Sequence, residues 1–235
     1  MAVRIGSARI DEHNRITGGR YGDQTGYEVC TEDWYKHSLG WVVCRAKDPE
    51  QREWIATAME QACENDLIGY DQNYRNTLFN AAKEVGFCPA KITRACDTDC
   101  SALVRICCLY AEINVPDFYT GNEVAVLEQT GKFDIIRDAD VCDRDRLLMR
   151  GDILVTRTQG HTAVVLSDGD GIRQEEPSAD IYSLAAAAQV ITGDYDAFIS
   201  YLADRAINGD FGNGERRKQL LRGLYDDVRA EINRR

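Results

Sequence analysis

Two residues far apart in the sequence, Cys100 and His161, have the types and the local settings that thiol chemistry requires. Cys100 follows the polar run Asp97–Asp99 and precedes the apolar residues Ala102–Val104, so it lies at the start of a predicted helix. The unpaired N–H groups and the positive dipole end of a helix stabilise a thiolate there, and the thiolate is the nucleophilic form of cysteine. The two aspartates before Cys100 oppose its ionisation by like-charge repulsion, which a neighbouring imidazolium would offset.

His161 is the histidine best placed to serve Cys100. It opens a predicted strand, residues 161–166, directly after a turn at Gln159–Gly160, so it stands at the end of a rigid element. The other two histidines lie in irregular polar segments. The residues alone also permit a plain structural interpretation, in which Cys100 is an inert buried thiol and His161 is a hydrogen-bonded histidine at a strand end.

The elements that must position these two residues follow the order of an α+β fold. The apolar periodicity predicts helices over Pro49–Glu64, over Asn76–Val85 and from just after Cys100, followed by strands over 151–156, 161–166 and 172–175. Residues 1–45 mix glycine, charge and aromatic residues, and we expect turns between short irregular segments there.

A second, small domain is predicted at the C-terminus. Residues 184–194 have the composition of a junction, and the remaining residues show the pattern of three short helices. The sequence therefore predicts a domain over residues 1–190 and a three-helix unit over residues 196–235. A unit this small has a thin core and would be marginally stable alone.

Composition excludes several classes of protein. Apolar residues make up 44% of the 235 residues and charged residues 29%, which is ordinary for a soluble globular protein. The net charge of −11 argues against general affinity for nucleic acid or anionic lipid. No stretch approaches the roughly 20 apolar residues of a membrane helix, and the N-terminus lacks the apolar core of a signal peptide. We therefore expect that the protein does not associate with membranes and has no signal peptide.

The nine cysteines favour reduced thiols over a disulfide framework, because their number is odd and their spacing irregular. No C-x-x-C pair occurs, and the chain has only three histidines. We therefore expect no metal site and no cofactor.

The segment around Cys100 resembles a family motif. Asp99–Val104 is similar to the (D/N)-C-S-(G/A)-(L/F)-V motif of NlpC-type cysteine peptidases of the cell wall and of the related CHAP amidohydrolases. Gly151–Leu154 and Gly160–Val165 resemble the two strands of that family, in the same order and spacing. Tyr70–Gln72 fills the place of a Y-D-Q segment found in phage lysins that hydrolyse peptidoglycan. The resemblance covers residues 65 to 175 well and the first 60 residues loosely.

The resemblance implies a papain-like α+β fold and hydrolysis of an amide bond in bacterial peptidoglycan. Cys100 would attack the amide carbonyl while His161 takes the thiol proton and then protonates the leaving amine. Backbone N–H groups at the helix start would stabilise the oxyanion. Family members include endopeptidases and N-acetylmuramoyl-L-alanine amidases, and the sequence does not choose between them.

The resemblance also implies further site residues. A third polar residue follows the histidine by about twelve positions, where this chain has Arg173, which cannot accept the imidazole N–H. We assign that role to Gln174, with Glu175 and Asp168 as alternatives. Substrate contacts are expected at positions near the nucleophile, Tyr70, Asp71 and Ser101, although a tyrosine at position 70 is equally consistent with a core residue.

The C-terminal segment resembles the Cpl-seven wall-binding repeat of phage lysins, a three-helix bundle that binds the sugar–peptide unit of peptidoglycan. The matching positions are Ala203, Ile207, Gly209, Gly212, Asn213, Gly214, Arg217, Leu221, Tyr225, Val228, Ile232 and Asn233. Departures are Phe211 for tryptophan, Arg229 for glutamine and Arg222 for glycine. The resemblance implies wall contacts from Asp210, Gly212, Asn213, Gly214 and Arg217, and a loop-shaping role for the same turn is the alternative.

Together the two resemblances predict a phage-type lysin that stays in the host cytoplasm until lysis and then acts on the wall. One repeat provides one weak contact, which pairing of chains would strengthen, so we hypothesise a homo-oligomer. Two other functions remain open: a non-catalytic peptidoglycan-binding protein, and a cysteine transferase or deconjugating enzyme with a convergent Cys–His pair.

Overall fold

The structure is a computed structural model that describes residues 2–172, 195–207, 211, 217, 218, 221 and 224–234. The chain divides into two compact units, residues 1–172 and 173–235, and each is described by itself. The predicted domain boundary between residues 190 and 196 lies mostly outside the described residues and stays a prediction.

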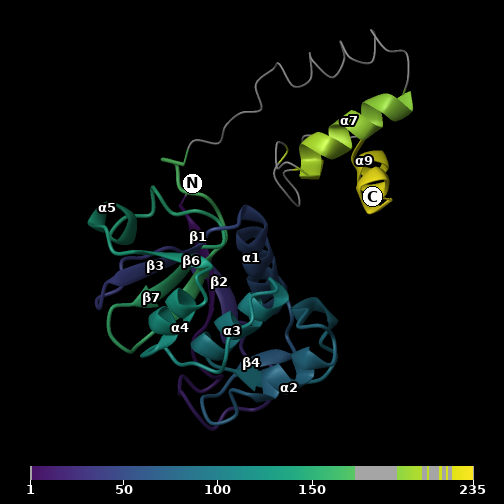
Figure 1. Ribbon diagram of the computed structural model, residues 1–235. Helices are drawn as coiled ribbons and strands as arrows, with labels where there is room; N and C mark the ends of the chain where they lie inside the picture. The colour runs from purple at the N-terminus through teal and green to yellow at the C-terminus, as the bar shows by residue number, and fades with distance from the viewer. Residues whose placement is uncertain are drawn as a thin grey trace. The chain divides into compact units, whose positions relative to one another are not determined.

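The first unit is built on a six-stranded sheet in the order β2-β1-β8-β7-β3-β6, in which every neighbouring pair is antiparallel (Figure 1). Its strands are β1 (Arg4–Ala8), β2 (Val29–Asp33), β3 (Trp41–Ala46), β6 (Phe133–Ile136), β7 (Ile153–Thr156) and β8 (Thr162–Val165). Helices together with an antiparallel sheet confirm the α+β expectation, and the predicted hairpin is present as β7 and β8.

The expectation of irregular structure over residues 1–45 is wrong, because three of the six strands lie between Arg4 and Ala46. β1 pairs with β8, more than 150 residues further along the chain, and β3 pairs with β6 and β7. Short strands of this kind are stabilised by distant partners rather than by local propensity. Their sequences therefore carry little signal on their own.

The sheet is buried on both faces, which is why its central strands are continuous apolar runs. Alternate residues point to opposite faces of a strand. Val164 packs on the face covered by α1 and α3, whereas Ala163 and Val165 pack on the other face with Trp41.

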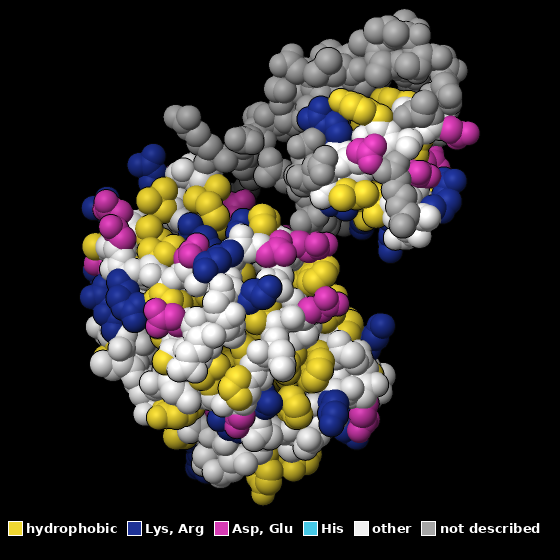
Figure 2. Space-filling model, in the orientation of Figure 1, with side chains coloured by type: hydrophobic (Ala, Val, Ile, Leu, Met, Phe, Trp, Pro, Cys, Tyr) yellow, Lys and Arg dark blue, Asp and Glu magenta, His cyan; other side chains and the backbone are white. Residues whose placement is uncertain are grey.

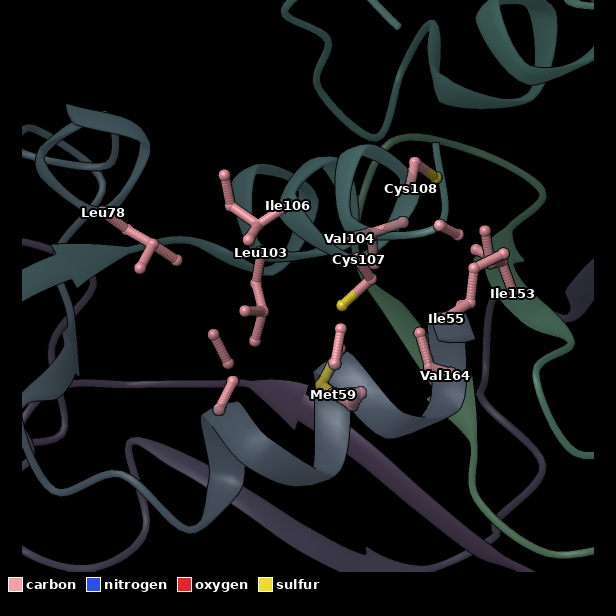
Figure 3. Packing of buried hydrophobic residues seen from close by; sticks show 14 of the residues in the cluster. Ile55, Met59, Leu78, Leu103, Val104, Ile106, Cys107, Cys108, Ile153 and Val164 are labelled. Atoms are coloured by element: carbon pink, nitrogen blue, oxygen red, sulfur yellow. The ribbon is translucent and has the colours of Figure 1, made fainter. Parts of the chain in front are cut away.

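Helices α1 (Pro49–Cys63) and α3 (Cys100–Tyr110) lie side by side on one face of the sheet (Figure 1). Each begins at a capping aspartate: Asp48 accepts from the N–H of Glu50, and Asp99 accepts from the N–H of Ala102 at 2.7 Å. Figure 3 shows the apolar packing between these helices and the sheet, contributed by Ile55, Met59, Leu103, Val104, Cys107, Ile153 and Val164.

The remaining elements of the first unit are short. They are the parallel strands β4 (Ile68–Tyr70) and β5 (Cys96–Thr98), the helices α2 (Thr77–Lys83), α4 (Glu123–Gln129) and α5 (Ala139–Cys142), and the 3₁₀ turn η1 (Pro89–Lys91). β5 leads into α3 with only Asp99 between them, so the pairing of β4 with β5 also helps to fix the start of α3.

The turn before β7 explains the Gly-Asp pair that opens this strand in the sequence. Gly151 has a φ of +87°, and a side chain there would collide with the backbone of Arg52 in α1. Asp152 is fully buried and forms a bidentate ion pair with Arg45 of β3 at 2.7–2.8 Å. The two residues thus tie β7 to α1 and β3.

The described part of the second unit contains α7 (Tyr195–Ile207) and α9 (Tyr225–Asn233), which pack together. Their shared core consists of Phe198, Ile199, Leu202, Ala203, Ala206, Phe211, Leu221 and Val228. The predicted middle helix falls largely outside the described residues, so the three-helix bundle stays a prediction. Phe211, which stands where the repeat has tryptophan, is buried in this core.

On the face shown in Figure 2, Lys and Arg side chains of the first unit lie among Asp and Glu side chains. The first unit contains several ion pairs, such as those of Arg150 with Glu53 and Glu60. Among the described residues, no helix has both the length and the apolar character needed to span a membrane.

Candidate functional site

Cys100 is the first residue of α3, as the sequence predicts. Asp99 caps the helix through the N–H of Ala102, while the first N–H groups of a helix have no partner within the helix. The Cys100 side chain is only 8% exposed, because the start of β8 and the β4–α2 segment lie against it. The nucleophile candidate therefore lies just beneath the surface.

Thr162 brings the start of β8 to Cys100. Its backbone N–H donates toward the Cys100 sulfur, as does the N–H of Ser101. His161 precedes Thr162 by one peptide bond, so the structure brings the two predicted residues into one region from 61 positions apart in sequence. Among the described hydrogen bonds, none joins the Cys100 thiol directly to the His161 ring.

Burial keeps both groups uncharged in the resting structure. Burial raises the pKa of the Cys100 thiol to about 12, with a further increase from the charges of Asp99 and Glu123, and the two N–H donors only partly offset it. Burial also lowers the pKa of His161 to about 4, assisted by the positive charges of His37 and Arg9. The resting pair is therefore a neutral thiol and a neutral imidazole.

An arginine neutralises the aspartate that precedes the thiol. Arg75 Nε lies 2.9 Å from Asp99 Oδ2, and the same guanidinium donates to the Ser101 hydroxyl and to the carbonyl of Phe118. The like-charge repulsion expected from Asp99 is thus reduced by a direct ion pair. No local pattern around Arg75 marks this role, because its partners lie 24 or more residues away.

Glu123, at the start of α4, is a buried carboxyl that the sequence did not indicate. It is fully buried, and Thr162 Oγ1 donates to its Oε1 at 2.8 Å, while its Oε2 has no hydrogen-bond partner among the described residues. Burial raises the pKa of Glu123 to about 8. An acidic residue in the first turn of a helix is ordinarily exposed and interacts favourably with the helix dipole. The sequence therefore gives no reason to single out Glu123.

Replacing Glu123 with glutamine is expected to stabilise the protein at alkaline pH and to change little at pH 4. Folding raises the pKa of this carboxyl from 4.5 to about 8. Between these two pH values the unfolded chain loses the proton and the folded chain keeps it, so the free energy of unfolding falls as pH rises from 4.5 to about 8. Glu123→Gln removes that dependence while keeping an acceptor for Thr162. Thermal unfolding from pH 4 to pH 9 measures the effect, and parallel profiles for both proteins would contradict it.

Aromatic rings surround the His161 ring just before β8. Its centroid lies 6.3 Å from that of Trp41 and 6.4 Å from that of His37. Thr156 fixes the backbone at this position, since its hydroxyl accepts from the His161 N–H at 2.9 Å. The imidazole is thus held at the strand end by rings and by the turn that precedes it.

The predicted third residue, Gln174, lies outside the described residues, as does its alternative Glu175. β8 is already paired on one side with β7 and on the other with β1, so a following strand finds no free edge of β8 to pair with. Asp168 is not suitable, because the whole of β8 separates it from His161 and its carboxylate accepts from the N–H of Arg150. The role of Gln174 therefore stays a prediction.

The three predicted substrate contacts are buried. Tyr70 lies near Cys100, and burial together with the thiol raises the pKa of its hydroxyl. The Asp71 carboxylate accepts from four backbone N–H groups, those of Gly18, Gly19, Asn73 and Tyr74. Ser101 Oγ donates to Asp99 at 2.9 Å. Asp71 and Ser101 therefore shape the site from within, and neither presents its side chain to solvent.

Of the five predicted wall contacts, only Arg217 belongs to the described residues. Its guanidinium donates to the carbonyl of Ala206 in the last turn of α7 at 3.0 Å. Asp210, Gly212, Asn213 and Gly214 lie outside the described residues, and their predicted roles stay predictions. Arg217 thus contributes to the structure of the unit, which favours the loop-shaping alternative for this residue.

The cysteines and acidic residues of the described chain form no metal site: no group of three or more His, Cys, Asp or Glu side chains is arranged to hold an ion. All nine cysteines are free thiols, and six of them are buried. Most of the thiols therefore act as small apolar core residues.

Comparison with known proteins gives one match, to a family model described as an endolysin-like domain, over residues 5–172. No curated protein and no solved structure matches the chain. The matched range coincides with the first compact unit and contains both Cys100 and His161. The expectation of a lysin acting on the cell wall is confirmed at this level, and the chain belongs to the endolysin-like domain family.

Proposed function

We propose that the first unit is a cysteine hydrolase of peptidoglycan amide bonds, of the NlpC or CHAP type with a papain-like arrangement. One observation carries the proposal: the start of α3 with Cys100 lies against the start of β8, where Thr162 follows His161. A thiol at a helix N-terminus beside a histidine at a strand end is the arrangement that thiol hydrolysis needs. Family membership supports peptidoglycan as the substrate.

In this proposal His161 acts as a general base for a neutral thiol. As Cys100 attacks the carbonyl carbon of the amide, its proton passes to the imidazole, and the new negative charge forms on the carbonyl oxygen. The imidazolium then gives the proton to the leaving amine, and water releases the acyl group from the sulfur. Catalytic hydrogen bonds are often long in an unliganded enzyme and shorten when substrate binds.

The surroundings of the thiol supply the electrostatic part of the mechanism. The N–H groups of Ser101 and Thr162 point toward the sulfur and stabilise its charge as the proton leaves. The Arg75–Asp99 ion pair limits repulsion at the same place. The N–H of Cys100, which has no partner within the helix, is the oxyanion donor in this proposal, and such a donor contributes about 10²–10³ in rate.

The test is digestion of purified peptidoglycan, followed by mass spectrometry of the soluble fragments. We expect turbidity to fall and each cut to produce one new amine and one new carboxyl, the two products of amide hydrolysis. The masses distinguish an endopeptidase from an N-acetylmuramoyl-L-alanine amidase. Fragments with new reducing sugar ends, or no fragments at all, would refute the proposal.

The burial of Cys100 is the observation that favours the alternative, a peptidoglycan-binding protein without hydrolytic activity. The two functions differ in one respect, because a binding protein sediments with the polymer and leaves its bonds intact. The digestion experiment therefore decides between them.

We propose in addition that the second unit anchors the enzyme to the wall through a Cpl-seven-type repeat. A chain that ends at residue 172 keeps the whole compact first unit, so its sedimentation with peptidoglycan can be compared with that of the full chain. We expect the full chain to bind at least about tenfold more tightly, since tethering raises the effective concentration of the enzyme at its polymer. Equal binding of the full chain and the chain that ends at residue 172 would contradict the anchoring role of the second unit. It would favour the alternative of a cysteine transferase acting on another substrate.

Family membership supports the bacterial wall as the site of action, and in this proposal the enzyme reaches it from the host cytoplasm at lysis. Pairing of chains through either unit would add a second wall contact. Gel filtration at high concentration tests this homo-oligomer, and a monomer there would contradict it.

A further inference from the structure

A cleft of about 380 Å³ lies beside the turn that leads into His161. One wall is the segment Thr156–Gln159, between β7 and β8, and the other is the start of α4 with the residues before it. The Gly160 N–H donates to Thr120 Oγ1 at 3.2 Å and so ties the two walls together. Helix α4 contributes to both the cleft and the site, because Val124 lines the cleft and Glu123 accepts the hydrogen bond of Thr162.

Two arginines line this cleft, Arg137 after β6 and Arg157 after β7. Arg137 is exposed and has no ion pair or hydrogen bond among the described residues. Arg157 is half exposed; its Nε donates to the carbonyl of Trp41 at 3.4 Å, and its guanidinium forms a long ion pair with Asp143 at 3.8 Å. Acidic residues outnumber basic ones by 39 to 28 in this chain, so an arginine without an ion pair among the described residues, such as Arg137, is unusual.

The shape and chemistry of the cleft fit an acidic peptide. Val42 and Val124 form an apolar part, and Thr158 and Gln159 add polar side chains beside the two arginines. A guanidinium matches the geometry of a carboxylate and binds it with two parallel hydrogen bonds. Peptide side chains and backbone suit the mixed apolar and polar lining.

We propose that this cleft is a subsite for a carboxylate of the peptidoglycan stem peptide, with Arg137 as its main ligand and Arg157 as the second. The inference rests on the proposed function, because it deepens the specificity of the same site. The net charge of −11 repels a substrate carboxylate. Arginines in the cleft offset this repulsion where the carboxylate binds.

The test uses two soluble disaccharide–peptide fragments that differ only in whether the stem-peptide carboxyls are free or converted to amides. We expect the wild-type chain to have a KM about tenfold lower for the free acid, the scale of one charge-assisted contact at a partly exposed site. Arg137→Gln should raise KM about tenfold for the acid and leave KM for the amide unchanged. Arg94→Gln, which removes an exposed arginine paired with Glu84 outside the cleft, is the matched control.

Binding is measured separately, by titrating each fragment into the Cys100→Ala chain with and without Arg137→Gln. If the wild-type chain cleaves neither fragment, the proposed function fails. The titration still tests whether the cleft binds a carboxylate, because it measures affinity and not cleavage. Equal affinity for acid and amide, or no effect of Arg137→Gln, overturns the carboxylate subsite. An effect of Arg137→Gln that appears with whole walls but not with the fragments also overturns the subsite. Such an effect would point to phosphodiester groups of the wall as the ligand, and the fragments carry none.

Discussion

Replacing Cys100 with alanine is expected to abolish lysis, with a loss of at least about 10³-fold in the rate of peptidoglycan hydrolysis. In the proposed mechanism the substitution removes the sulfur that forms the acyl–enzyme bond, which neither the neighbouring N–H groups nor His161 can replace. Because the side chain is small and lies at the start of α3, its loss leaves the apolar packing of Leu103 and Val104 in place. Turbidity of cells and release of soluble fragments measure the effect.

The matched control is Cys88→Ala, which removes a half-buried thiol at the start of η1, away from the site. We expect this variant to keep wild-type activity. Sedimentation of Cys100→Ala with peptidoglycan should be unchanged, which separates loss of chemistry from loss of binding or of fold. Undiminished lysis by Cys100→Ala would exclude the thiol mechanism outright.

Replacing His161 with alanine is expected to lower kcat by about 10²–10⁴, the usual contribution of a general base. His37 is the informative comparison, because its ring stacks on His161 and it is the nearest other imidazole. His37 Nδ1 accepts from the N–H of Leu39 at 3.0 Å, which occupies one of its two ring nitrogens. We therefore expect a loss of about tenfold or less for His37→Ala, and the reverse order would identify His37 as the base.

The pH dependence provides a second measurement on the same residue. A base with a pKa of about 4 is neutral above that pH, so kcat/KM should hold at neutral pH and fall only as pH drops through about 4. His37→Ala removes one of the positive charges that lower this pKa, so the acidic limb should move to higher pH. An unmoved limb in that variant would show that another group controls it.

Local pattern was sufficient for the elements that carry the proposed chemistry. Polar residues before an apolar-periodic run predict a helix whose first turn lies at or next to Cys100, and α3 begins at Cys100 with Asp99 as its cap. A glycine turn between two apolar runs predicts the hairpin that places His161 at the start of β8. Capping, helical periodicity and a tight turn each depend on residues that are close together in the chain. The sequence alone is therefore sufficient to predict these elements.

Only the tertiary structure decided what surrounds those two residues. β1 pairs with β8 on the side away from β7, and Trp41 and His37 lie against the His161 ring. Glu123 becomes a buried, protonated carboxyl only because α4 packs on the sheet beside Thr162. These contacts join segments tens to more than a hundred residues apart, and burial, which sets the pKa of each group, depends on how the whole chain packs.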